Sequence, residues 1–552
     1  MSLRPASIAL AIALALATGA SGAIGVAAGG GCASVLGFED TTLRAAGEAG
    51  AGDGGPNDEG GPAVDGGVAR LGTTPERLLV RRGESVDVTV AIVREGIAGA
   101  ITARLTDLPA GVTATTATLD AATSSATLKL SATAMATLGP VAVKLVAEGT
   151  SLPASDVPLV VADAPGSFDT TWDGDGLVVD GTRNAGATFF TLAVQPDQRV
   201  LAGGSAGAPL TGWMLRRFLP SGVADAAFNA LGVGLPIDGE IRAIATLATG
   251  KIVCVGASAP AAAMPTQATI VRLDAAGAID KTFGAPTGVV RLPAEAPGTS
   301  TALGVAVQPD GAVIVVGLRR DAGGLESGII TRFKSDGVRD PTFNGGATIV
   351  TPGARYVGVT IEGEGILVAG SSTNAGSTNI PSYVLTRRTA QGANDNTFAN
   401  AGTATFGNTF RATSFARLPD GLLAVAGDVN PPGQASYTAG VMTTKVITQF
   451  TRGFATLPGA AFYGVAAQDA TRVVAVGHTA VVNGEARVGR FSALDGKPDP
   501  TFSDAGTATI EPGGVANNFE VALYAAAVEG SGRILAAGNR SNAGAVIYRL
   551  WP

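Results

Sequence analysis

Short runs of alternating apolar and polar residues fill the chain from residue 71 to residue 163. Residues 85–92 read SVDVTVAI, in which every second residue is aliphatic. A period of two is typical of a strand with one buried face. Turn-forming segments such as Pro109-Ala110-Gly111 separate such runs. Further runs lie at 100–105, 117–119, 126–130, 141–146 and 157–161. About seven short strands in this length predict a small β-sandwich over 71–163.

The pattern from residue 165 to residue 552 is a repeat of four short apolar runs. One unit reads GVVRL, TALGVAVQPDG, AVIVVG and SGIITRF, with turn-forming residues between the runs. In Gln308-Pro309-Asp310-Gly311, Pro supplies a fixed φ and Gly a positive φ, as a tight hairpin requires. Seven such units of about 55 residues predict a seven-bladed β-propeller.

A short motif, Gly-x-x-Asp-x-x-aromatic, marks the repeats. Its Asp and aromatic residues are Asp169 and Trp172, Asp225 and Phe228, Asp280 and Phe283, Asp340 and Phe343, Asp395 and Phe398, and Asp499 and Phe502. The last interval is about twice the others, so the sixth unit has lost the motif. Glycines that end an apolar strand, at 203, 256, 317, 370, 427, 477 and 538, give seven units, with Gly477 in the degenerate one. We expect each Asp to accept backbone N–H groups in its own turn, and each ring to pack within or between blades.

These residues resemble the bacterial delta-60 repeat. Asp340-Pro341-Thr342-Phe343, Gly304–Gly311 and Thr331-Arg332-Phe333 match its pattern, and the resemblance covers 165–552. It implies a propeller-like structure on exported bacterial proteins, with no catalytic residue and no defined ligand. Residues 108–132 resemble bacterial immunoglobulin-like domains, although the Cys…Trp…Cys core of antibody domains is missing. That resemblance implies a spacing or adhesion role for the Ig-like sandwich.

The N-terminus resembles a lipoprotein-type signal peptide over residues 1–31. Arg4 supplies a positive charge, Ile8–Ala17 is uninterrupted apolar sequence, and small residues follow. Gly30-Gly31-Cys32 resembles the end of a lipobox, with Gly29 where the family has a large aliphatic residue. The resemblance implies lipidation of Cys32 and membrane attachment through that lipid.

The alternative is cleavage near Ala23, which would give a soluble secreted protein with a free thiol at Cys32. In either case the protein is expected to be exported. Residues 32–70 are rich in Gly, Ala and Asp and contain too few apolar residues to fold. We therefore expect them to form a flexible tether.

Composition narrows the function classes. The chain has 78 Gly and 30 Pro, 46% hydrophobic and 15% charged residues, which favours an all-β protein with many turns. With one His and two Cys, it has no His/Cys metal cluster or disulfide framework. The net charge is −7 and Lys and Arg run in pairs at most, which disfavours a nucleic-acid partner. The single His478 is expected in a surface loop, and Cys254 as a small buried hydrophobe.

Two pairs of acidic residues are candidates for chemistry. Asp173 and Asp175 could supply oxygen ligands to calcium, but their position matches a turn of the repeat, and they are weak candidates. Glu362 and Glu364 could act as paired carboxylates on a glycoside, but they align with a hairpin of the neighbouring unit. We expect no cofactor.

Three functions follow from this sequence. The leading one is a non-catalytic binding or scaffold protein of the cell envelope that presents a propeller to a protein or polysaccharide, because its distinctive polar residues recur in every unit. The first alternative is a propeller enzyme acting on glycans, or a quinoprotein-like oxidoreductase. The second is a purely structural envelope protein.

Overall fold

The computed structural model describes residues 69–552 with short interruptions. The residues left out are 181–185, 208–211, 229–237, 262–263, 293–297, 373–381, 407–409, 430–437, 446–450, 459, 480–484, 504, 511–520 and 542. The predicted signal peptide, Cys32 and nearly all of the predicted tether lie outside the described residues. Within the described ranges the chain is all-β, with two helical turns, η2 (Gly284–Gly288) and η3 (Asn344–Gly346). No helix among these residues is long and apolar enough to cross a membrane.

The first domain is a β-sandwich of nine strands, two more than the pattern predicted. One sheet contains, in spatial order, β1 (Arg70–Thr74), β3 (Ser85–Val93), β7 (Ser125–Ala132) and β5 (Val112–Ala114). The other contains β2 (Leu78–Arg81), β9 (Ser155–Ala162), β8 (Gly139–Glu148), β4 (Ile101–Thr106) and β6 (Ala117–Leu119). Alternate residues such as Val88 and Val90 of β3 and Leu145 of β8 form one shared core. The alternate, inward-facing residues of the two sheets therefore pack against one another and hold the sheets together.

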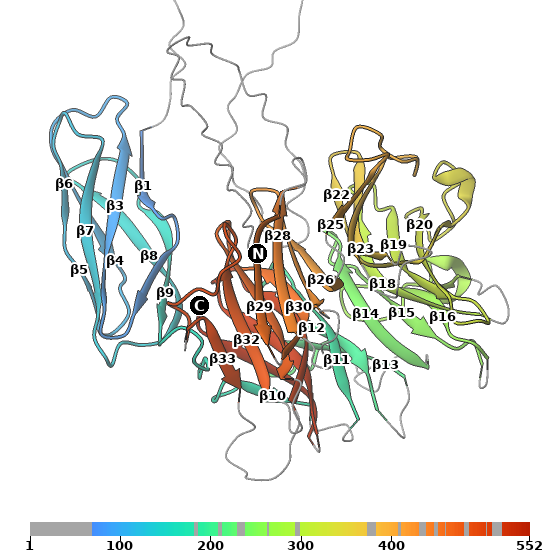
Figure 1. Cartoon of the computed structure of the whole chain (residues 1–552). Helices are drawn as coiled ribbons and strands as arrows, with labels where there is room; N and C mark the ends of the chain where they lie inside the picture. The colour runs from blue at the N-terminus through green and yellow to red at the C-terminus, as the bar shows by residue number, and fades with distance from the viewer. Residues whose placement is uncertain are drawn as a thin grey trace, which may run out of the picture.

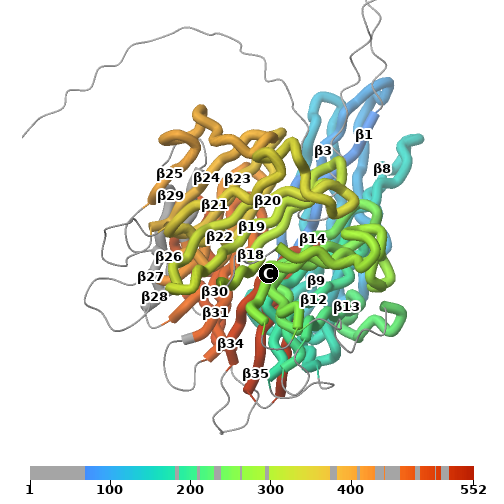
Figure 2. The backbone as a smooth tube through the Cα atoms, turned by 90° about the vertical axis from the view of Figure 1, so that its right-hand side faces the viewer, coloured from blue at the N-terminus to red at the C-terminus, as the bar shows by residue number. Residues whose placement is uncertain are grey.

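Seven antiparallel sheets follow among the residues that the structure describes, and Figures 1 and 2 show them as successive blades. The first three are β11 (Thr188–Val194), β12 (Val200–Ser205), β13 (Trp213–Phe218); β14 (Gly239–Thr246), β15 (Ile252–Ser258), β16 (Gln267–Leu273), β17 (Val289–Arg291); and β18 (Thr299–Val307), β19 (Val313–Arg320), β20 (Glu326–Phe333), β21 (Ile349–Pro352). The next two are β22 (Ala354–Glu362), β23 (Gly365–Ser372), β24 (Ser382–Arg388), β25 (Thr403–Phe406); and β26 (Phe410–Arg417), β27 (Leu422–Val429), β28 (Thr438–Lys445), β29 (Thr451–Pro458). The last two are β30 (Ala460–Ala467), β31 (Arg472–Thr479), β32 (Ala486–Ser492), β33 (Thr507–Ile510); and β34 (Val521–Val528), β35 (Ile534–Arg540), β36 (Gly544–Leu550), with β10 (Leu177–Val179).

The sheets are arranged in a closed β-propeller. The first strand of each sheet contacts the first strand of the next in chain order, from β11 to β34, and β34 contacts β11. The outer strand of the last sheet is β10, which comes from the start of the domain and pairs with β36. The first and last parts of the domain therefore share one sheet, and this closes the ring.

Each first strand contains a β-bulge near its beginning. The bulged residues, here called the bulge ring, are Phe190, Arg242, Leu303, Val357, Thr413, Tyr463 and Tyr524. The residue before each bulge lies opposite a glycine of the second strand, as Ala302 lies opposite Gly317. A Cβ on Gly317 would lie 2.0 Å from the carbonyl oxygen of Thr301, so the bulge leaves room for glycine only. This explains the repeated glycine that ends an apolar strand.

In the first sheet, the glycine at this position is Gly204. It lies opposite Phe189, whereas the expected Gly203 lies one residue earlier in β12. From the sequence alone, either Gly203 or Gly204 could be the glycine opposite the bulge. Only the register between β11 and β12 shows that it is Gly204.

The sandwich contacts one end of the propeller. Trp551 directly follows β36 and is fully buried against Val160 and Ala162 of β9. Leu550, the last residue of β36, pairs with Ile534, the first residue of β35. Ile534 directly follows the hairpin that joins β34 to β35. The sandwich therefore lies at the end of the propeller that carries these hairpins, here called the hairpin side (Figure 1). The bulges and their glycines are at the opposite ends of the strands, here called the bulge side.

Candidate functional site

The repeated Asp and aromatic residues belong to one kind of cluster, completed by an arginine. In the third sheet, Arg332 Nε donates to Asp340 Oδ2 at 2.7 Å, and its guanidinium carbon lies 5.1 Å from the centre of the Phe343 ring. Asp340 Oδ1 accepts the backbone N–H of Thr342 at 2.9 Å, which is the turn contact expected for this Asp. Arg332 also donates to the carbonyl of Ala390 in the next sheet at 2.6 Å. The cluster thus fastens a turn to its own sheet and to the following one.

The same cluster occurs at all six copies of the motif. The arginine, aspartate and aromatic residue are Arg217, Asp225 and Phe228; Arg272, Asp280 and Phe283; Arg332, Asp340 and Phe343; Arg387, Asp395 and Phe398; Arg490, Asp499 and Phe502; and Arg549, Asp169 and Trp172. In four copies the arginine precedes its aspartate by eight residues. This constant spacing was a signal in the sequence that could have identified the arginine. Thr443 occupies the equivalent register position in β28, in the part of the chain without the motif.

The aromatic rings pack between sheets. Gly337 of one motif lies against Phe283 of the preceding copy, and a Cβ there would lie 3.1 Å from that ring. Gly392 contacts Phe343 in the same way, and Gly166 contacts Phe502, which continues the series around the ring. The glycine of the motif therefore makes room for the ring of the preceding motif.

The ion pairs change the pKa of the aspartates. Burial alone would raise the pKa of Asp340, but hydrogen bonds from Thr342 and the charge of Arg332 outweigh it and hold the pKa below its usual value. The pKa values of Asp225, Asp280 and Asp499 are lowered in the same way. These carboxylates are ionised and already paired, so they are suited to structure rather than to proton transfer.

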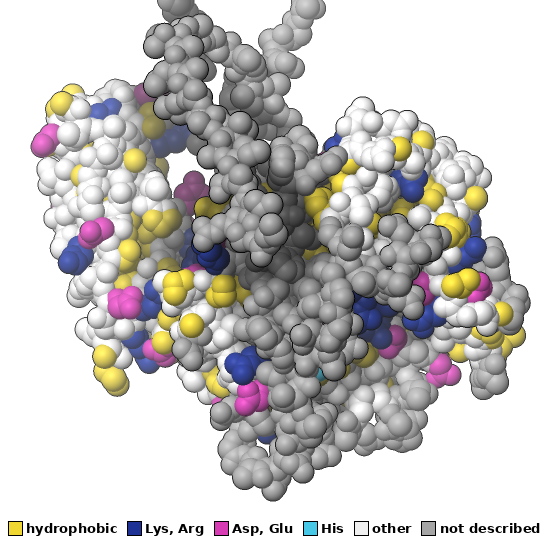
Figure 3. Space-filling model, viewed as in Figure 1, with side chains coloured by type: hydrophobic (Ala, Val, Ile, Leu, Met, Phe, Trp, Pro, Cys, Tyr) yellow, Lys and Arg dark blue, Asp and Glu magenta, His cyan; other side chains and the backbone are white. Residues whose placement is uncertain are grey.

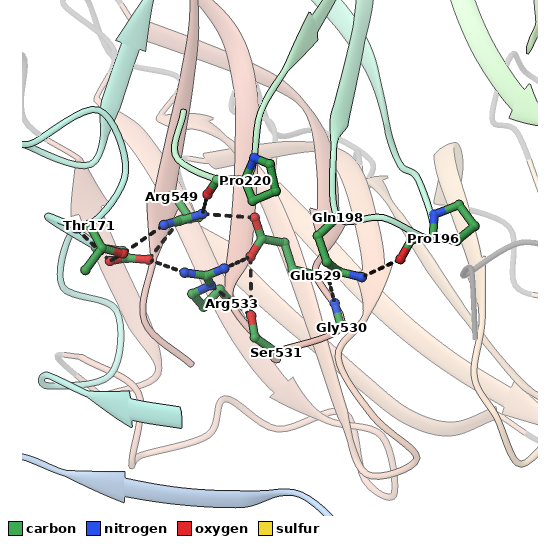
Figure 4. Close-up of polar contacts among 10 residues, drawn as sticks. Thr171, Pro196, Gln198, Pro220, Glu529, Gly530, Ser531, Arg533 and Arg549 are labelled. Atoms are coloured by element: carbon green, nitrogen blue, oxygen red, sulfur yellow. Dashed lines mark hydrogen bonds and ion pairs between the residues drawn. The ribbon is translucent and has the colours of Figure 1, made fainter. Parts of the chain in front are cut away.

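The ring closes on a larger buried version of the cluster. Arg549 Nε lies 2.7 Å from Asp169 Oδ2, and its Nη1 lies 3.2 Å from Glu529 Oε1. Arg533 contacts the same two carboxylates, at 3.2 Å and 2.6 Å. Figure 4 shows both guanidinium groups pointing toward Glu529. All four side chains are buried, so the loss of any one of them would leave a buried charge uncompensated where the first motif meets the last sheet.

The remaining acidic candidates have structural contacts. Asp175 Oδ1 accepts the backbone N–H of Leu177 at 2.9 Å, and the exposed Asp173 has a positive φ in the same turn. Among the residues that the structure describes, no three His, Cys, Asp or Glu side chains gather as a metal site would require. Glu362 ends β22 at its hairpin and lies 3.4 Å from Arg417 of the next sheet, while Glu364 is exposed in the turn.

The two remaining single candidates lie in strands. Cys254 is fully buried in β15, as expected for a small hydrophobe, and burial raises the pKa of its thiol well above the ordinary value. His478 lies in β31 rather than in a loop. Its ring stacks on Tyr463 of the bulge ring, with 5.3 Å between the ring centres. The histidine therefore belongs to a site that the sequence pattern did not indicate.

Aromatic residues occupy one half of the bulge ring. Tyr463 lies 5.4 Å from Tyr524, and Tyr524 lies 5.3 Å from Phe190, measured between ring centres. These three residues come from sheets that follow one another around the ring. The next sheet contributes Arg242 of β14, whose guanidinium carbon lies 4.0 Å from the centre of the Phe190 ring. All are half-buried, so each ring is held by neighbours yet reaches solvent. Together with His478 they form a continuous aromatic arc.

Arginines occupy the other half of the bulge side. Arg242, Arg320, Arg355 and Arg411 come from four consecutive sheets and lie near Glu240, Glu326 and Asp428. Burial lowers the pKa of Arg355, and the positive charges of Arg411, Arg320 and Arg242 lower it further, against the opposing effect of Glu326. Arg355 is therefore repelled by each of the other three arginines. Figure 3 shows Lys and Arg side chains gathered over the region of β14 and β15.

The bulge side thus combines an aromatic arc with an arginine group. Sequence reasoning missed it because its members come from several units and are brought together only when the ring closes. The position that these units share is the bulged residue of the first strand, and its residue type varies, since only Tyr occurs there twice among the seven sheets. Variation at one position of an otherwise regular repeat is typical of a binding surface.

The match to a protein-family model supports the propeller fold. The family model described as "Domain of unknown function (DUF5122) beta-propeller" matches residues 308–343, from the hairpin after β18 to Phe343. Two solved structures are similar to the chain at low identity. Sqt1 of Chaetomium thermophilum, bound to the N-terminus of ribosomal protein L10, is 13% identical over 67% of this chain and 98% of its own, with a TM-score of 0.33. A mutant of the alpha-L-arabinofuranosidase Arb93a of Fusarium graminearum, in complex with an iminosugar inhibitor, is 12% identical over 56% and 91%, with a TM-score of 0.31. No curated protein matches the sequence.

Proposed function

We propose that this β-propeller protein is a non-catalytic binding module of the bacterial cell envelope, exported and anchored by a lipid on Cys32. The observation that carries the proposal is the contrast between two sets of polar residues. The repeated Asp and Arg residues pair with one another between sheets, as Arg332 does with Asp340. The unique residues, such as Tyr524 and Arg355, gather instead on the bulge side, where they are partly exposed.

The position of the sandwich agrees with this role. It contacts the hairpin side through Trp551, so the bulge side is at the other end of the strands. An anchor N-terminal to the sandwich would leave the bulge side accessible to a partner. Repeated, mutually paired carboxylates also argue against an enzyme, because catalysis requires groups arranged around one reacting centre.

The binding role can be tested by capturing envelope components on the mature protein. We expect capture to be lost when Tyr524→Ala and Arg355→Gln are combined on the bulge side. Lys497→Gln is the matched control, since Lys497 is 78% exposed in the turn that follows β32 on the hairpin side. Equal capture by all three proteins, or capture of no component, would contradict the binding role.

The anchor needs a separate experiment. Cys32→Ser should move the protein from the membrane fraction to the soluble fraction, because the substitution removes the thiol that would carry the lipid. Unchanged membrane association would contradict lipidation at Cys32.

A further inference from the structure

We propose that the bulge side binds an anionic polysaccharide, with sugar rings on the aromatic arc and carboxylates on the arginine group. This inference rests on the binding role proposed above and specifies the ligand class. The bulge side has two unlike halves, the aromatic arc and the arginine group, and both lie at the same end of the propeller.

The aromatic half suits the apolar faces of sugar rings. Tyr463, Tyr524 and Phe190 present half-buried rings from consecutive sheets, each in contact with the next. Rings held in this way lose little side-chain entropy when a ligand binds. The C–H groups of a pyranose pack on such rings, and the hydroxyls of Tyr463 and Tyr524 can hydrogen-bond to the sugar.

The arginine half suits carboxylates. A guanidinium group can donate two parallel hydrogen bonds to one carboxylate, and four such groups lie on adjacent sheets. Within the described part of the chain, three acidic residues pair with these four arginines, so this group has an excess of positive charge although the whole chain has a net charge of −7. A polyanion would be repelled by most of the molecule and attracted here.

The positive charge of Arg355 is unfavourable where it lies, because the side chain is partly buried and other arginines are near it. Arg355 is only 36% exposed and lies 4.0 Å from the acidic Glu326, whereas Glu326 is closer to Arg320, at 2.6 Å. A bound anion would offset the repulsion between Arg355 and the arginines around it.

The backbone of this face favours a sugar chain over an extended acidic peptide. A peptide strand gains much of its affinity by adding to a sheet edge through regular main-chain hydrogen bonds. Each first strand is interrupted by a bulge at this position, as β14 is at Arg242 and β34 at Tyr524. Bulges disrupt the regular ladder and discourage strand addition. Recognition here must use side chains.

Binding of three polymers to the mature protein tests the proposal by calorimetry. The polymers are polygalacturonate, its fully methyl-esterified form, and poly-L-glutamate. We expect polygalacturonate to bind most tightly, with an affinity that falls as salt is added. Tyr524→Ala and Arg355→Gln should each weaken it by about tenfold or more, the effect of losing one hot-spot side chain. Lys497→Gln should leave it unchanged, and thermal melting of each variant shows whether it remains folded.

Each other result decides against the proposal in a different way. Equal binding of the methyl ester would show that the arginines do not read carboxylates. Equal binding of poly-L-glutamate would replace the sugar with an acidic peptide, and the binding role would stand. No binding of polygalacturonate would overturn the ligand class, while capture of an envelope component that depends on Tyr524 would still support the binding role.

Discussion

Arg549, in the last strand of the chain, contacts Asp169, which precedes the first strand of the propeller, through Nε and Oδ2 at a distance of 2.7 Å. Both side chains are fully buried. The same guanidinium reaches Thr171 at 2.9 Å and the carbonyl of Pro220 at 2.8 Å, so one side chain joins three segments. The two ends of the propeller are thus linked by the cluster that elsewhere links successive sheets.

Removing this arginine should cost more stability than removing its equivalent within the ring. Arg549→Gln leaves Asp169 and Glu529 buried with one cation fewer, and we expect a loss of about 3–5 kcal/mol in the free energy of unfolding. Arg387→Gln is the matched variant, because Arg387 and its Asp395 are 21% and 22% exposed. It should cost about 1 kcal/mol.

Guanidinium denaturation followed by tryptophan fluorescence measures both variants. The three tryptophans, Trp172, Trp213 and Trp551, are buried in the propeller or where it meets the sandwich, so the signal reports on propeller unfolding. Equal losses in the two variants would show that ring closure has no special importance for stability.

Acid should destabilise the propeller through the repeated aspartates. Five of them have pKa values that are lower in the folded protein than in the unfolded chain, so their contribution is complete above the ordinary pKa of Asp, about 4. These five are Asp225, Asp280, Asp340, Asp395 and Asp499. As pH falls through the folded pKa values, the unfolded chain binds more protons and this contribution is lost. We therefore expect the denaturation midpoint to be constant from pH 7 to pH 5 and to decrease below about pH 4.

Asp280→Asn provides the control for this pH dependence. Asp280 is paired with both Arg272 and Lys251. The variant should be less stable at pH 7, and its midpoint should depend less on pH in the acid range. A midpoint that is the same at pH 3 and pH 7 in the unchanged protein would contradict the assignment.

The strands and hairpins could be predicted because their causes are local. Alternating burial produced β3, and the turn residues of Gln308–Gly311 produced the hairpin between β18 and β19. The hydrogen bond within the turn at Asp340 is local for the same reason. Period and turn chemistry act over a few residues, so a single sequence contains the whole signal.

The parts that could not be predicted depend on distant partners. A bulge adds one residue to a strand and shifts the register, which a pattern of apolar residues does not reveal. Strand β2 pairs in parallel with β9, which lies near the opposite end of the sandwich sequence, and was missed. The aromatic arc brings together Phe190 and Tyr524, which are neighbours only because β11 contacts β34.

The buried thiol gives a direct test of the packing inside a sheet. Cys254 lies in β15 between Ile244 of β14 and Val271 of β16, and burial raises its pKa, so the reactive thiolate is scarce. In the Cys32→Ser protein it is the only cysteine, and we expect no reaction with Ellman's reagent until denaturant is added. Ser335→Cys, at an exposed turn, should react at once in the folded protein. Prompt reaction of Cys254 in the folded state would show that β15 is open to solvent.

The glycine opposite each bulge should be intolerant of any side chain. Gly317→Ala places a Cβ 2.0 Å from the carbonyl oxygen of Thr301, and the backbone on both strands must move to relieve the contact. We expect a loss of about 4 kcal/mol or more in the free energy of unfolding, the range of severe local disruption. Gly323→Ala is the matched control in the same sheet, since its Cβ would meet only the side chain of Asp321, at 3.3 Å. That variant should stay within about 1 kcal/mol of the unchanged protein. If the two substitutions had similar effects, the bulge would not be the reason for the glycine.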